Sequence, residues 1–223
     1  MRRCIRVGIA AGLALELAAR PASAQDVLSD RMQLDRIQLV SLGAGAGSIA
    51  PSQVDPTSVF VLSSDYGEIS PAWRVLFRIS YWESKFKNSV VQAFVDTLQS
   101  NLVNPTATTI RPSDVTLYDA TFAIGARRLL IPRAAITPFF SGGIAAHVIN
   151  AEGPLIKGTF VERSLDGIAS GVFAEGGLRV RVIRRVLLEA ALRGDLLSGF
   201  RSAQWYAIGS YFFAEPRRGG SGR

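Results

Sequence analysis

The chain has 223 residues, with 25 lysines and arginines against 18 aspartates and glutamates, and a single cysteine, Cys4. Because that cysteine lies close to the start, the rest of the chain excludes disulfide scaffolds and thiolate chemistry. The formal net charge of +7 comes mostly from scattered arginines, many of which alternate with acids, and this argues against the contiguous basic face that nucleic-acid binding needs.

Residues 1–24 are typical of a secretory signal peptide. Three arginines precede a mostly apolar run over residues 7–19, and Ala22-Ser23-Ala24 offers a small-residue cleavage site. A permanent membrane anchor is a poorer interpretation, because the apolar run is short and Glu16 interrupts it. Cleavage would remove four arginines and one glutamate, lower the net charge to about +4, and leave residues 25–36 as a periplasmic segment before the first strand.

The segment 172–182 shows the pattern that dominates the rest of the chain. Its even-numbered positions are apolar or glycine, whereas Glu175, Arg179 and Arg181 stand at odd-numbered positions. Side chains alternate between the two faces of a strand, so one face is apolar and the other is ionic. A soluble sheet would bury the apolar face, and a membrane barrel would turn it towards lipid and enclose the charges.

The gaps between such segments favour the membrane barrel. Long and short connections alternate along the chain, as extracellular loops and periplasmic turns do in outer-membrane barrels, and an even number of strands leaves both termini on the periplasmic side. The sequence predicts eight antiparallel strands in an up-and-down transmembrane β-barrel over residues 37–213, followed by a polar tail at 214–223. The strands are expected near 37–49, 58–69, 73–85, 115–131, 136–149, 169–183, 186–199 and 203–213.

The charged side chains on the inward faces of these strands are the first candidate site. Parity places arginines and acids together in the lumen, where they would form either a polar path for small solutes or an ion-pair network that fills the interior. We favour the network, because an eight-stranded barrel is only wide enough for its own side chains and the two signs nearly balance. Its predicted members are Arg74, Arg78, Asp119, Arg127, Glu175, Arg179, Arg181, Glu189, Arg193 and Asp195, with Asp65 opposite them.

The long segment after the third strand, 86–114, contains a second candidate. Its apolar residues recur at helical spacing, Asn88 or Ser89 could cap the helix, and Asn104-Pro105 would end it. Such a helix could cover the barrel mouth, close an apolar opening in the side of the barrel, or contact a partner, or it could simply bury its own stripe at the rim. The predicted interaction residues are Val91, Phe94, Val95, Leu98 and Leu102.

The single histidine, His147, is expected to face the lumen near the extracellular end of its strand. A hydrolase site would need a serine at a matched position, and Val148 and Ile149 follow instead. A metal site would need more ligands than one histidine without cysteine provides. The sequence therefore predicts no catalytic site, no metal and no cofactor.

Aromatic residues are expected to form belts at the two membrane interfaces. The predicted periplasmic belt contains Trp73, Phe212 and Phe213, and the predicted outer belt contains Tyr81, Trp82, Tyr118, Trp205 and Tyr206.

The signal with Ala22-Ser23-Ala24, the alternating strands and the aromatic segment 205–213 together resemble the small eight-stranded outer-membrane barrels of the OmpA, OmpX and OmpW type. In that family the last strand is read by the barrel-assembly machinery, and Trp205, Tyr211 and Phe213 match its alternation. The family usually ends at the terminal phenylalanine, whereas this chain continues for ten residues. The resemblance implies a location in the bacterial outer membrane, in contact with its lipid.

The sequence favours a non-enzymatic outer-membrane barrel with a structural or interactive role through loops 86–114 and 150–168, where an extracellular partner would bind. A narrow channel or transporter for small or apolar compounds is the main alternative. A lipid-modifying barrel enzyme and a soluble barrel that binds a ligand are further alternatives.

Overall fold

The computed structural model describes residues 38–70, 72–101, 115–132, 134–154, 156–158, 166–198 and 200–213. The predicted signal peptide, the predicted periplasmic segment 25–36 and the tail 214–223 lie outside these residues, so their roles stay predictions.

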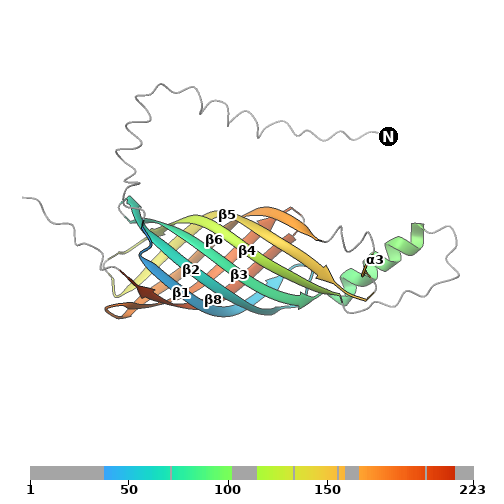
Figure 1. The fold of residues 1–223 in the computed structure, drawn as a ribbon, viewed down its shortest axis with the longest axis horizontal. Coiled ribbons are helices and arrows are strands. Elements are labelled where there is room, and N and C mark those ends of the chain that lie inside the picture. The colour runs from blue at the N-terminus through green and yellow to red at the C-terminus, as the bar shows by residue number, and fades with distance from the viewer. Residues whose placement is uncertain are drawn as a thin grey trace, which may run out of the picture.

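The described residues form one closed barrel in which each strand pairs with the next and β8 pairs with β1 (Figure 1). All eight pairings are antiparallel, from Ser41↔Asp65 between β1 and β2 to Ser41↔Phe212 between β1 and β8. This confirms the predicted eight-stranded up-and-down barrel. The strands are β1 Ser41–Pro51, β2 Thr57–Ser70, β3 Trp73–Lys85, β4 Thr116–Leu129, β5 Ile136–Glu152, β6 Gly167–Ile183, β7 Val186–Leu197 and β8 Phe200–Phe212.

The exterior of the barrel is apolar and the interior is charged, the reverse of a soluble barrel. Phe60, Ile144 and Leu192 are 63%, 63% and 70% exposed, whereas Arg78 and Glu175 are buried. A soluble protein would bury the first three and hydrate the last two. The exterior therefore faces lipid, and the soluble-barrel alternative is wrong.

One end of the barrel carries both ends of the described chain. The other carries the helix and the two longest connections, between β3 and β4 and between β5 and β6 (Figure 1). By the usual arrangement of such barrels, the first end is periplasmic and the second is extracellular. Among the described residues, no helix is long and apolar enough to cross a membrane.

Strand β1 forms a wall of small residues where the barrel closes. At Gly45 and Gly47 an added Cβ atom would meet the backbone of β8, at Ala207 and at Trp205 and Tyr206 respectively. Side chains at these two positions would therefore push the two closing strands apart. This close approach explains why β1 carries glycines at these positions.

The helix α3, Asn88–Asn101, extends beyond the extracellular end of β3 (Figure 1). It confirms the predicted helix between the third and fourth strands. Val95 is buried and Val91 is half-buried, whereas Phe94 is 44% exposed. Of these three predicted interaction residues, therefore, only Val95 is fully buried. The side chain of Leu98 and the whole of Leu102 lie outside the described residues.

Three of the predicted belt residues lie inside the barrel instead. Trp82, Tyr206 and Phe212 are buried, at 2%, 1% and 7% exposure. The belt assignments were wrong because they followed residue type and strand end, whereas parity already placed Trp82 on the face of Arg78 and Tyr206 opposite Trp205. Trp205, Tyr211 and Phe213 point outwards as predicted.

Candidate functional site

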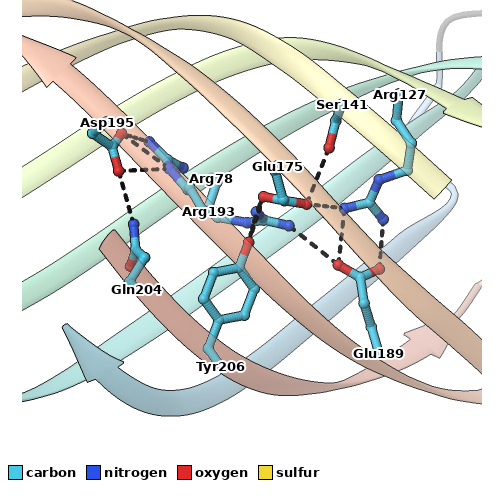
Figure 2. A network of polar contacts seen from close by, with 9 residues as sticks. All are labelled: Arg78, Arg127, Ser141, Glu175, Glu189, Arg193, Asp195, Gln204 and Tyr206. Atoms are coloured by element: carbon cyan, nitrogen blue, oxygen red, sulfur yellow. Dashed lines mark hydrogen bonds and ion pairs between the residues drawn. The ribbon is translucent and has the colours of Figure 1, made fainter. Parts of the chain in front are cut away.

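The middle of the lumen is filled by a tetrad of two arginines and two glutamates (Figure 2). Arg127 donates to both carboxylate oxygens of Glu189, at 2.5 and 2.8 Å, and to Oε1 of Glu175 at 2.9 Å. Arg78 donates to Glu175 and, at 3.3 Å, to Glu189. The Tyr206 hydroxyl donates to Glu175 and accepts from Arg78. Five strands, β3, β4, β6, β7 and β8, are thus connected across the lumen by charge-assisted hydrogen bonds.

The arginines of the lumen also stack on aromatic rings. The Arg127 guanidinium lies 3.9 Å from the ring centroid of Phe139, and that of Arg193 lies 4.2 Å from the centroid of Phe173. Planar guanidinium groups fill the space between rings well and keep their N–H groups for the carboxylates. The interior is therefore packed with side chains as well as paired in charge.

A second ion pair lies beside the tetrad, nearer the extracellular end. Arg193 donates to Asp195 through Nη2 at 2.6 Å and through Nε at 3.0 and 3.1 Å. Gln204 donates to the same carboxylate at 3.0 Å from the neighbouring strand β8 (Figure 2). Asp195 is therefore fully engaged.

His147 belongs to a third polar group, with Asp119 and Thr121 of the adjacent strand β4. Its Nδ1 lies 2.8 Å from Oδ2 of Asp119 and 3.1 Å from the Thr121 hydroxyl, while its Nε2 is buried without a partner in the described residues. In a nucleophile–histidine–acid site the hydroxyl contacts the nitrogen opposite the acid. Here the hydroxyl and the acid share one nitrogen, so the arrangement is not that of a hydrolase.

The extracellular end of the lumen is closed by apolar side chains. Trp82 of β3 stacks on Phe200 of β8, with ring centroids 6.2 Å apart. Val54, from the connection between β1 and β2, is fully buried and its backbone pairs with Phe86 next to the helix. We call these side chains the mouth plug, and its buried members are Ile49, Val54, Val59, Trp82, Val115, Leu117, Ala151, Ile156 and Phe200.

At the periplasmic end, Arg74 pairs with Asp65 at 2.7 Å and with Glu68 at 3.5 Å. Two other predicted members of the network, Arg179 and Arg181, join no ion pair with the described residues. Arg179 is buried within reach of the charges of Arg74 and Asp65, and Arg181 is exposed over the ring of Phe212. Parity gives the face on which an arginine lies but not its distance to an acid, and this is why the sequence grouped them with the network.

Sequence reasoning missed the uncharged partners of the site. Tyr206, Ser141 and Gln204 each contact a buried carboxylate. All three stand at inward positions of their strands, so parity could have identified them. Among the described residues, no group of three or more histidine, cysteine or acidic side chains could hold a metal ion.

The comparisons with known proteins give structural similarity only. No protein-family model matches the chain, and no curated protein matches its sequence. The Neisserial surface protein A is 16% identical, with a TM-score of 0.47, over 78% of this chain and 96% of that one. Ail of Yersinia pestis, solved with the heparin analogue sucrose octasulfate, is 12% identical, with a TM-score of 0.46, over 79% and 99%. The outer membrane protein OprG of Pseudomonas aeruginosa is 10% identical, with a TM-score of 0.46, over 80% and 98%.

The architecture of the chain itself fixes its surroundings. A closed antiparallel barrel with an apolar exterior, an ion-paired interior and both described ends on the side of the short turns is a membrane-spanning barrel. The chain is an outer-membrane barrel of the Gram-negative type, as the sequence predicted.

Proposed function

We propose that the protein is a non-conducting scaffold of the outer membrane whose function is carried by its extracellular segments, 86–114 and 150–168. The observation that carries this proposal is the closed lumen. The mouth plug and the tetrad lie one below the other in the barrel, and Trp82, Arg78 and Glu175 are each no more than 2% exposed. A solute would have to separate stacked rings and then charged pairs in order to pass.

The main alternative, a narrow channel, needs a continuous polar path. The lumen instead presents apolar side chains at its extracellular mouth, where Phe200 and Leu117 are buried. An interior of eight strands is just wide enough for side chains to fill. The buried arginines are therefore part of the packing and not of a path for ions.

The helix supports the extracellular role. It begins directly beyond the outer end of β3, and Phe94 stays 44% exposed while Val95 is buried. An exposed aromatic side chain above a membrane barrel is available for a partner, because contact with a partner would remove its apolar surface from water. The partner in this proposal is extracellular, and outer-membrane lipid surrounds the barrel below it.

The proposed function does not include catalysis. His147 is buried in the lumen, its acid and hydroxyl neighbours share Nδ1, and the described residues put no second hydroxyl at Nε2. A lipid-modifying enzyme would need this group to face lipid or solvent. During biogenesis the outward aromatic residues of β8, Trp205 and Tyr211, are the features that the barrel-assembly machinery would meet.

The lysines of the chain provide a direct test of surface display. The sequence contains only Lys85, Lys87 and Lys157, and all three lie at the end of the barrel that we assign as extracellular. A membrane-impermeant amine reagent applied to intact cells should label these lysines, of which Lys85 is exposed. The control is a chain with Lys85→Arg, Lys87→Arg and Lys157→Arg, which should lose this labelling. Labelling that requires broken cells would contradict the proposed orientation and with it the extracellular role.

A further inference from the structure

Arg179 of β6 is a buried guanidinium that has no partner among the described residues. It is 7% exposed, its Nη1 is buried and unpaired, and no described residue forms a hydrogen bond or an ion pair with it. A buried charge without a counter-charge destabilises a fold by several kcal/mol, about the same as breaking a buried ion pair. Such a group calls for a compensating negative charge.

The carboxylates of the described lumen are already engaged elsewhere. Glu175 and Glu189 bind Arg78 and Arg127, and Asp65 binds Arg74. The remaining two, at the extracellular side, hold their own partners: Asp195 binds Arg193, and Asp119 contacts His147. Arg179 is therefore the one buried arginine of the described lumen that no carboxylate pairs with, since Arg181, which is also unpaired there, is exposed.

The surroundings of Arg179 are basic. The guanidiniums of Arg74 and Arg127 lie close enough for their charges to act on it, opposed by the carboxylates of Asp65 and Glu189. Arg181 lies two residues nearer the periplasmic end on the same face of β6, exposed over the Phe212 ring. The guanidiniums of Arg181 and Arg179 thus follow one another from the periplasmic mouth into the lumen.

The position is close to the periplasmic surface. Arg179 pairs in register with Thr137, one residue from the start of β5, and Arg74 is the second residue of β3. The Thr137 hydroxyl donates to the Ala134 carbonyl at 3.0 Å and still has lone pairs but no further proton for a ligand. The donors for an anion are therefore the guanidinium N–H groups of Arg179.

We infer that Arg179, beside Arg74 and behind Arg181, binds a small inorganic anion such as chloride or phosphate from the periplasm. The anion would neutralise a buried guanidinium that no carboxylate of the described residues pairs with. This site is separate from the proposed extracellular function, because it lies at the opposite end of the barrel. If no anion binds there, the closed mouth and the role proposed for the extracellular segments are unaffected.

The test compares the folded full-length barrel, purified in a zwitterionic detergent, in sodium chloride, sodium phosphate and sodium gluconate at equal ionic strength. Gluconate serves as the anion too large to enter. Chloride or phosphate at about ten times its Kd should raise the apparent unfolding midpoint by about 3 to 5 °C over gluconate. The unfolding midpoints in chloride and in phosphate, compared with each other, show which of the two anions binds at the site.

Two variants separate the site from general salt effects. Arg179→Gln removes the unpaired charge, so it should unfold at a higher temperature than the wild type in gluconate and should lose the response to chloride and phosphate. Arg201→Gln changes an exposed arginine at the extracellular end and should keep the full response. An Arg179→Gln response equal to that of the wild type would overturn the inference, as would a wild-type midpoint that is the same in all three salts.

A direct binding measurement is independent of stability. The ³⁵Cl NMR line of a chloride solution broadens when the ion exchanges with a protein site, so the wild type should broaden it and phosphate should reverse the effect if it competes. Arg179→Gln should reduce the broadening to that of the detergent blank. Equal broadening by the two proteins would show an adventitious ion only and would refute the site.

Discussion

The indole of Trp82 and the ring of Phe200 stack inside the barrel, with centroids 6.2 Å apart and planes 7° from parallel. The two residues belong to β3 and β8, which are not neighbours in the sheet, so their contact crosses the lumen. The mouth of the barrel is therefore closed by a contact between opposite walls. Stacked apolar side chains of this kind are typical of the core of a soluble protein, and here they lie inside a membrane barrel.

Replacing Trp82 tests the mouth plug. Trp82→Ala should lower the free energy of unfolding by about 3 to 5 kcal/mol, because it leaves a cavity and removes the ring under Phe200. Urea-induced unfolding in lipid vesicles measures the loss. The matched control is Tyr81→Ala on the outward face of the same strand, which should cost clearly less. Equal losses would mean that the plug contributes nothing beyond ordinary aromatic burial.

The tetrad gives a test of buried charge. Glu175→Gln keeps the size of the side chain but leaves Arg78 and Arg127 without one of their two carboxylates. It should destabilise the barrel by about 3 to 5 kcal/mol. Glu83→Gln, an exposed change on β3, should have an effect of less than about 0.5 kcal/mol under the same conditions. A tolerated Glu175→Gln would show that the tetrad is not a stabilising network.

The lipid-facing exterior is tested by an added charge. Ile144 lies at the centre of β5, the 17-residue strand, and points outwards. Ile144→Arg should cost about 2 to 4 kcal/mol, the range for an arginine near the membrane midplane. Phe94→Arg on the helix changes another exposed apolar residue, outside the membrane, and should leave the unfolding free energy of the barrel unchanged. If the two substitutions behave alike, the proposed membrane boundaries are incorrect.

The closing seam of the barrel is tested at a glycine. A Cβ atom at Gly45 would meet the backbone of Ala207 on β8, whereas at Gly194 the nearest atom lies 3.9 Å away. Gly45→Val should therefore prevent the barrel from closing, and Gly194→Val should not. The fraction of unheated protein that migrates as a folded barrel on a gel measures the difference. Normal folding of Gly45→Val would refute the close approach of β1 and β8.

Much of the fold followed from alternation alone. The observed strands differ from the predicted ones by a few residues at their ends, because each strand must turn apolar side chains to lipid and polar ones inwards. The same rule placed Arg78, Glu175 and Arg193 in the lumen. Residue type proved a weaker guide than parity: Trp82 and Tyr206 were assigned to a membrane interface although they stand at inward positions.

The partners within the lumen could not be predicted in this way. Glu175 of β6 binds Arg127 of β4, two strands that do not pair with each other, so the contact depends on the register and diameter of the whole barrel. The isolation of Arg179 depends on the same geometry. Which of the several inward arginines lies within reach of a carboxylate depends on the three-dimensional structure of the folded barrel.

Conductance is the most direct test of a closed scaffold. The wild-type protein should be inserted into planar lipid bilayers from its folded, heat-modifiable form and recorded over a range of voltages. The membrane should show no current steps, because the mouth plug and the tetrad fill the lumen. Regular single-channel steps that persist in the wild type and change with Arg78→Gln would contradict it, and would show that the lumen is a path and not a packed interior.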